Sequence, residues 1–109
     1  MTSLSERIRQ LNDAFRCSLH GGQVVLTQGV LSLPAEGQSA LLEGVRRFNS
    51  FNADNNLYNE HDFGNLKHAG VTYFWKIDYY DQDLQFGSPD AADPNVTKRV
   101  MTLMRADEY

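Results

Sequence analysis

The chain has little cysteine, little proline and no long apolar run. Its 109 residues contain one cysteine, Cys17, and three prolines. A single cysteine forms no internal disulfide and builds no thiolate cage for zinc, so packing must hold the fold together. No apolar run reaches the roughly 18 residues that span a bilayer, and the charged segment 1–10 lacks the apolar stretch of a signal peptide. We therefore expect a cytoplasmic protein that makes no contact with a membrane.

The composition predicts that residues 1–109 fold by themselves as a single domain. Hydrophobic residues make up 41% of the chain and aromatic residues 11%, which is enough apolar surface to argue against intrinsic disorder. A length of 109 residues is typical of one core and excludes a second catalytic domain.

Positive charge is scarce in the middle of the chain. Residues 54–93 contain eight acids and two lysines, a net charge of -6, whereas residues 1–53 and 94–109 each carry +1. Domains that bind nucleic acid directly recruit Lys and Arg to displace counterions from phosphates. The charge map therefore favours a protein partner with a basic surface and disfavours direct nucleic-acid binding. The competing interpretation is that these acids only solvate loops.

Apolar spacing predicts two helices and a short strand in the first half of the chain. Apolar residues recur at helical spacing over 4–18, and Ser3 with Glu6 forms a capping box at the start of this segment. A β-branched run after two glycines predicts a strand over 23–27. A second helix is predicted from about residue 34 to residue 51.

The second half reads mainly as β-structure. Five asparagines mark 49–59 as a loop. The segments 61–66 and 70–81 flank a turn and predict a hairpin. The segment 96–104 fits either a helix or a buried strand, and its β-branched residues favour the strand. These elements together predict an α+β domain in which two helices pack against a three- to four-stranded antiparallel sheet.

Alternation along residues 71–80 assigns side chains to two faces of this strand. One face is predicted to be core and carries Val71, Tyr73, Trp75, Ile77 and Tyr79. The other face carries Thr72, Phe74, Lys76, Asp78 and Tyr80. A charged pair on an otherwise aromatic surface indicates either an ordinary surface ion pair or a recognition face in which Lys76 and Asp78 fix orientation.

Several stretches of the sequence resemble one known family. They are Arg9-Gln10-Leu11-Asn12-Asp13, Glu60-His61-Asp62-Phe63-Gly64, Phe74-Trp75-Lys76-Ile77-Asp78-Tyr79-Tyr80-Asp81, Gly87-Ser88-Pro89-Asp90 and the segment from Thr97 to Tyr109. The chain is similar in these stretches to the uncharacterised bacterial family catalogued as domain of unknown function 3768. The resemblance implies a setting on bacterial chromosomes, plasmids and other mobile elements, and it implies no reaction.

The residue chemistry offers an enzymatic alternative centred on His61. In an extended segment Glu60 and Asp62 point to the side opposite His61, so the three form no ready-made dyad. An EF-hand-like run that starts at Asp54 lacks the glycine at its sixth position and the glutamate at its twelfth. We predict no catalytic residue, no metal and no cofactor. The alternative left open is a small hydrolase or metal-assisted enzyme that uses His61 with nearby Asp residues.

The leading prediction is a small non-enzymatic protein-binding module of a bacterial mobile element. In its sharpest form the protein inhibits a host defence complex through an acidic surface that mimics nucleic acid. The hairpin predicts that the partner-binding residues share one connected surface; they are Glu60, His61, Asp62, Lys76, Asp78, Tyr80 and Asp81. The competing account is a structural network that fixes the loop at 49–59. The oligomeric state stays open.

Overall fold

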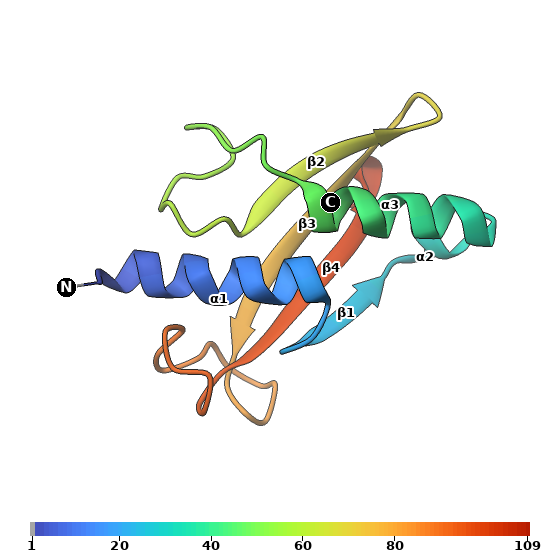
Figure 1. Cartoon of the computed structure of the whole chain (residues 1–109). Coiled ribbons are helices and arrows are strands. Elements are labelled where there is room, and N and C mark those ends of the chain that lie inside the picture. Colours follow the sequence, from blue (N-terminus) through green and yellow to red (C-terminus); the bar gives the residue numbers. More distant parts are fainter. Residues whose placement is uncertain (1) are drawn as a thin grey trace.

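The structure is a computed structural model that describes residues 2–109. Its sheet has four strands in the order β1-β4-β3-β2, and the two long helices α1 and α3 cross the same face of that sheet (Figure 1). The elements in chain order are α1 (Leu4–Ser18), β1 (Gln23–Leu26), α2 (Gln28–Leu31), α3 (Ala35–Arg47), β2 (Phe63–His68), β3 (Val71–Tyr80), β4 (Lys98–Arg105) and the 3-10 turn η1 (Ala106–Glu108). The predicted α+β class is confirmed.

The sheet is mixed, and the prediction of a purely antiparallel sheet is wrong. Strands β2, β3 and β4 pair antiparallel, but β1 runs parallel to β4. Parallel neighbours require a long crossover that returns the chain to the same end of the sheet. The segment between β1 and the hairpin contains α2, α3 and a long loop, and this crossover lets β1 join the edge of β4 in the parallel sense.

The first helix and the last strand follow the sequence pattern. The Ser3 hydroxyl accepts a hydrogen bond from the Glu6 backbone N–H at 3.2 Å, which is one of the two bonds of the predicted capping box. The segment predicted as a strand over 96–104 forms β4. Within residues 2–109, no helix has both the length and the apolar character that crossing a membrane requires.

The second helix is shorter than predicted and is preceded by another helix. The α3 helix ends at Arg47 because Phe48 takes an extended backbone, with φ -61° and ψ 131°. The short α2 was not predicted, since its four residues are too few to show a helical period. The hairpin turn at Ala69 and Gly70 has positive φ at both positions, 51° and 80°, which is the two-residue geometry that matches the twist of antiparallel strands.

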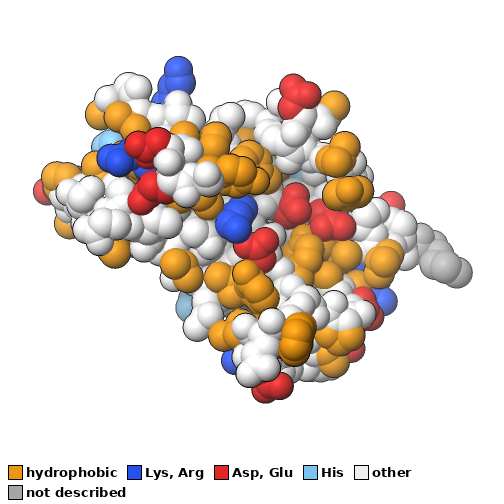
Figure 2. All heavy atoms as spheres, turned by 180° about the vertical axis from the view of Figure 1, so that it is seen from behind, with side chains coloured by type: hydrophobic (Ala, Val, Ile, Leu, Met, Phe, Trp, Pro, Cys, Tyr) orange, Lys and Arg blue, Asp and Glu red, His pale blue; other side chains and the backbone are white. Residues whose placement is uncertain are grey.

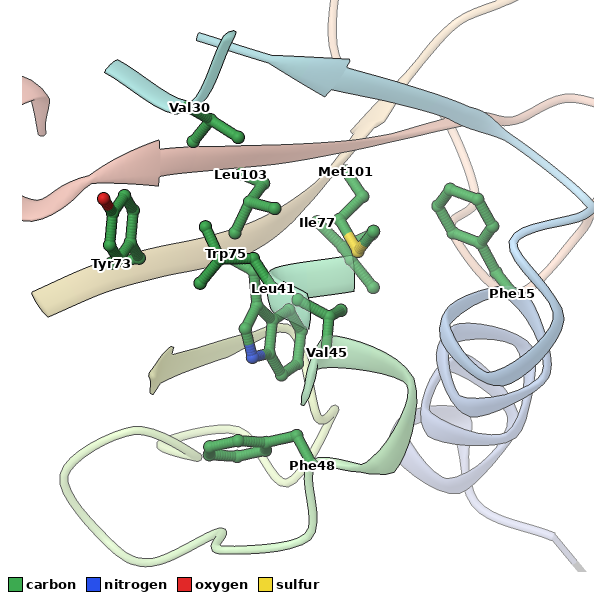
Figure 3. Close-up of a cluster of buried hydrophobic side chains, with 10 residues drawn as sticks. All are labelled: Phe15, Val30, Leu41, Val45, Phe48, Tyr73, Trp75, Ile77, Met101 and Leu103. Carbon is green, nitrogen blue, oxygen red and sulfur yellow. The ribbon is translucent and has the colours of Figure 1, made fainter. Parts of the chain in front are cut away.

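The core lies between the sheet and the two long helices. Tyr73, Trp75 and Ile77 of β3 are between 0% and 3% exposed, as the alternation predicts. Figure 3 shows these side chains beside Leu103 and Met101 of β4, with helix residues closing the cluster from the other side. Val71 departs from the predicted core face and is 40% exposed, because it begins the strand at the hairpin turn.

The Trp75 indole needs a glycine on the neighbouring strand. Gly64 pairs directly with Trp75, and a Cβ on Gly64 would lie 2.5 Å from the indole Nε1. Every real side chain at residue 64 would therefore push the largest core residue out of place. The edge strand β2 thus contributes to the core through Gly64, whose lack of a side chain leaves space for the Trp75 indole.

We predict that Trp75→Ala lowers the free energy of unfolding by about 3 to 5 kcal/mol, because it removes the largest buried side chain and leaves a cavity. The neighbouring Lys76→Ala should cost less than about 1 kcal/mol, since it removes only a surface ion pair. Urea denaturation of both variants measures the two effects. Equally mild losses would contradict the assignment of faces along β3.

Candidate functional site

The structure divides the predicted partner-binding residues between two sides of the sheet. Glu60 and His61 bond to groups of α1 and of the helix-covered side. Lys76, Asp78 and Tyr80 lie on the opposite face, which neither long helix covers (Figure 1). We call this opposite side the open face. The role of these residues in binding a partner stays a prediction.

His61 holds the loop that precedes β2. Its Nδ1 lies 2.9 Å and 3.1 Å from the two carboxylate oxygens of Asp13 in α1. Its ring stacks on Phe51 with centroids 3.7 Å apart and an interplanar angle of 2°, and its backbone N–H donates to Asn56 Oδ1 at 3.0 Å. These contacts are what the competing account requires, a network that fixes the loop at 49–59.

Arg16 of α1 is buried, at 4% exposure, and binds the end of α3. Its Nη1 donates to the carbonyl oxygens of Val45 at 2.9 Å and Phe48 at 2.8 Å. Its guanidinium carbon lies 5.5 Å from the ring centroids of both Phe51 and Trp75. The last carbonyls of a helix lack partners within the helix, so Arg16 supplies donors that α3 itself cannot.

A second polar network lies under α1 and joins three elements. The Tyr79 hydroxyl donates to Glu60 Oε1 at 2.8 Å and accepts from Asn12 Nδ2 at 2.7 Å. Arg99 Nε donates to Asn12 Oδ1 at 2.8 Å. Burial raises the pKa of the Tyr79 hydroxyl well above its usual value; the Asn12 hydrogen bond opposes this rise, and the bond to Glu60 adds to it. Tyr79 therefore stays a neutral donor, and the network is structural.

Four residues of these networks were not predicted as site residues: Asn12, Asp13, Arg16 and Arg99. A polar residue inside an amphipathic helix usually lies on the solvent side, and no local pattern shows which long-range group it meets. The signal that pointed to some of them was the family resemblance, whose stretch 9–13 includes Asn12 and Asp13 and whose stretch 97–109 includes Arg99. The resemblance drew attention to these residues but assigned no role to them.

The open face carries an ion pair beside aromatic rings. Lys76 Nζ lies 3.0 Å from Asp78 Oδ2, and the hydrogen bond to Asp78 is the main cause that raises the pKa of Lys76. Phe63, Phe74 and Tyr109 form a small cluster with ring centroids 5.3 to 6.0 Å apart. Figure 2, a view from behind, shows apolar side chains gathered on this side with charged groups among them.

A pocket of about 310 Å³ opens at the rim of the open face. Its lining consists of two acids, an asparagine and four apolar or aromatic side chains: Asp54, Asn55, Leu57, Tyr58, Asp62, Phe63 and Tyr109. Burial raises the pKa of the Asp62 carboxyl, and the nearby charges of Glu60 and then Asp78 add to this rise. Within residues 2–109 no ion pair involves Asp62.

The later acids of the acidic segment close turns. Asp81 Oδ1 accepts the backbone N–H groups of residues 83 and 85 at 3.2 Å and 3.1 Å. Asp90 and Asp93 each accept the N–H two residues ahead, at 3.0 Å and 2.9 Å. These carboxylates stabilise loop backbone, as short polar side chains do in turns. Asp81 thus differs from Asp78, whose carboxylate binds a side chain on the open face.

The chemistry that an enzyme would need is dispersed. Among the residues that the structure describes, no group of three His, Cys, Asp or Glu side chains is arranged to hold a metal ion. Cys17 is exposed, and its Sγ donates weakly to the Arg46 carbonyl oxygen at 3.6 Å. The Nδ1 of His61 is already engaged by Asp13.

Comparison with known proteins gives one match. The family model described as protein of unknown function DUF3768 matches residues 26–108. No curated protein and no solved structure matches the chain. The matched region contains β2, β3 and β4, only the last residue of β1, the loop at 48–62 and every pocket residue except Tyr109.

We predict that Arg16→Met lowers the free energy of unfolding by about 3 to 5 kcal/mol, since it leaves buried carbonyl groups without donors. The matched control is Arg47→Met, because Arg47 is 81% exposed and its bond to Glu43 is a surface ion pair. That control should lose less than about 1 kcal/mol. Guanidinium denaturation compares the two variants, and equal losses would contradict the capping role of Arg16.

Asp62→Asn should stabilise the protein at pH 7 by up to about 1 kcal/mol. The folded state binds the Asp62 proton more tightly than the unfolded state, whose pKa is near 3.8, so ionisation of Asp62 costs stability as pH rises above that value. The gain should disappear as pH falls to 3.8 and below. Thermal melts of the variant and of Asp83→Asn, which removes the same charge from an exposed loop, test this. A variant that is less stable than the parent at pH 7 would refute it.

Proposed function

This chain belongs to the DUF3768 family of proteins of unknown function, and we propose that it is a small protein-binding module that acts through its open face. The observation that carries the proposal is the placement of both long helices on one side of the sheet (Figure 1). The other side keeps the ion pair between Lys76 and Asp78 and the ring cluster of Phe63, Phe74 and Tyr109.

The chemistry of this face is that of an interface. Tyr and Phe are enriched in the cores of protein interfaces, because they bury a large area at a small cost in side-chain entropy. Leu57, Tyr58 and Tyr109 at the rim are 70% to 75% exposed. Clustered apolar side chains that remain in water favour the approach of another surface.

The charge of the pocket at the rim of this face favours a basic partner. Lys76 is neutralised by Asp78 at 3.0 Å, whereas Asp62 and Asp54 in the adjoining pocket have no ion-pair partner within residues 2–109. The strand register also places Lys67 and Lys98 on this face, opposite Thr72 and Tyr80, so the excess negative charge is local to the pocket at the rim, which is lined by Asp54 and Asp62. Electrostatic complementarity then favours a protein with Lys or Arg on its surface, and the same charge repels the phosphates of nucleic acid.

A more specific version of the proposal concerns the biological setting in which the protein binds its partner. In the bacterial mobile elements that the family resemblance implies, a suitable partner is a nucleic-acid-binding component of a host defence complex. Occupation of its phosphate-binding surface by the open face would inhibit that complex in the cytoplasm. The support for this form is the pair of carboxylates in the pocket at the rim, Asp54 and Asp62, together with the resemblance.

The enzymatic alternative has less support. It requires His61 to be available as a base or a ligand, but Asp13 and Phe51 hold the imidazole on the helix-covered side. Its candidate acidic partners are Asp62, Asp78 and Asp81. Asp78 and Asp81 are engaged by Lys76 and by turn backbone, and Asp62 lines the pocket at the rim of the open face.

The proposal predicts that Asp78→Lys abolishes retention of the partner from a lysate of the source cell while the protein stays folded. The reversed charge would repel a basic surface, and the partner kept by the parent protein should also elute between about 0.15 M and 0.5 M salt, because screening weakens surface attraction. Quantitative affinity capture with mass spectrometry provides the measurement.

The matched control is Glu36→Lys, which makes the same charge change at an exposed position of α3 on the helix side. This control should retain the partner. Equal retention by Asp78→Lys and the parent, or tight binding of the parent to duplex DNA at physiological salt, would overturn the proposal.

A further inference from the structure

We propose that the pocket beside Asp62 is a binding site for a cationic side chain, the guanidinium of an arginine or the ammonium of a lysine presented by the partner. This inference rests on the proposed function, and it names the group that the open face would recognise. The pocket lies where the loop at 48–62 meets the end of the chain, and its lining brings Asp54, Asp62 and three aromatic rings together.

The aromatic lining suits a cation. Tyr58, Phe63 and Tyr109 come from three separate segments and border the same space. The rings of Phe63 and Tyr109 meet edge to face, with centroids 6.0 Å apart and an interplanar angle of 81°, so the two rings present surfaces of different orientation. The negative face of an aromatic ring attracts ammonium and guanidinium groups.

The carboxylates of Asp54 and Asp62 supply the negative charge that would attract a cation to the pocket. Asp62 is half-buried, and the only hydrogen bond that the structure gives this residue outside its own turn is made by its backbone carbonyl, which accepts from the Ile77 N–H at 2.9 Å. Burial raises the pKa of its carboxyl, and a hydrogen bond from its own backbone and the charge of His61 offset this rise only in part. A cation in the pocket would give that carboxylate a charge-assisted hydrogen bond.

The lysine on the neighbouring strand does not fill this role. Lys76 pairs with Phe63 across the hairpin, but its ammonium is bound to Asp78 at 3.0 Å. The Asp62 carboxylate therefore stands beside an ion pair without joining it. A cation that pairs with Asp62 would therefore be supplied by another molecule, since no ion pair of the described residues involves this carboxylate.

The size of the pocket agrees with a single side chain. Small-molecule sites range from roughly 300 to 1,000 Å³, and a volume of about 310 Å³ lies at the lower end. A side chain with an apolar stem could place its stem against Leu57 and its charge near Asp62. A single arginine that fills a pocket in this way is a common form of binding hot spot.

The test titrates the whole protein with three small probes while amide resonances of Asp62, Phe63 and Tyr109 are followed by NMR. The probes are N-acetyl-argininamide, N-acetyl-lysinamide and the neutral isostere N-acetyl-citrullinamide. We expect saturable shifts with both cations at dissociation constants on the order of 1 mM, and at least about tenfold weaker binding of the citrulline probe. Equal binding of the neutral probe, or the absence of saturable shifts, would overturn the site.

Variants separate the two components of the site. Asp62→Asn should weaken both cationic probes by about tenfold, and Tyr109→Leu, which keeps an apolar side chain but removes the ring, should weaken them by about threefold or more. Glu36→Gln removes a carboxylate on the helix side and should leave both affinities unchanged. Equal affinities for Asp62→Asn and Glu36→Gln would overturn the proposal.

The same variants distinguish this inference from the proposed function. If Asp78→Lys loses the captured partner but Asp62→Asn retains it as the parent does, the cation site is wrong and the binding module stands. If the cationic probes bind in the pocket but Asp78→Lys retains the partner, the module is wrong and the cation site stands without it.

Discussion

Arg16 joins α1 to the end of α3, and the path of the chain from there to the hairpin follows from this contact. Its guanidinium donates to carbonyl oxygens of Val45 and Phe48 and lies over the rings of Phe51 and Trp75. A buried charge is costly unless its hydrogen bonds are made. The helix must therefore end where Arg16 can reach its carbonyls, and the loop that follows must pass over the same guanidinium.

That loop is the link between the buried side of the sheet and the pocket. Phe51 stacks on His61, and Asp13 holds both His61 Nδ1 and Arg16 Nη2. Helix α1 thus fixes the loop at two points. Asp62 comes directly after His61 in the sequence and lies at the rim of the open face. Its carboxylate makes no ion pair within the described chain. A residue that costs stability where it stands is typical of a binding site, since functional groups are often held in unfavourable surroundings.

The sequence predicted the elements with a clear period and missed features that depend on distant partners. The alternation through Tyr73, Trp75 and Ile77 identified the core face because burial of one face is local to a strand. The parallel pairing of β1 with β4 could not be read in the same way, since it depends on the crossover made by α2 and α3. The end of α3 depends on Arg16, which belongs to another helix.

In the candidate site, too, the features that follow a local pattern were predicted and those that depend on distant groups were not. Alternation placed Lys76 and Asp78 on one face, and their ion pair is present. For Glu60 and His61 the assumption of an extended segment fails, because Asn59 and His61 have positive φ angles of 59° and 55°. The chain therefore turns twice before β2, and Glu60 and His61 face α1 while Asp62 reaches the pocket. Non-glycine residues seldom adopt such angles, and nothing in the local sequence required them.

The central claim is that recognition belongs to the open face and that the helix-covered side serves stability. Photo-crosslinking tests it most directly: a photoreactive phenylalanine analogue replaces either Tyr80, on the open face, or Gln10, at an exposed position of α1. Each protein is irradiated in a lysate of the source cell, and covalent adducts are identified by mass spectrometry. The account predicts an adduct with a basic protein from position 80 and none from position 10. The same adduct from position 10 alone would contradict it.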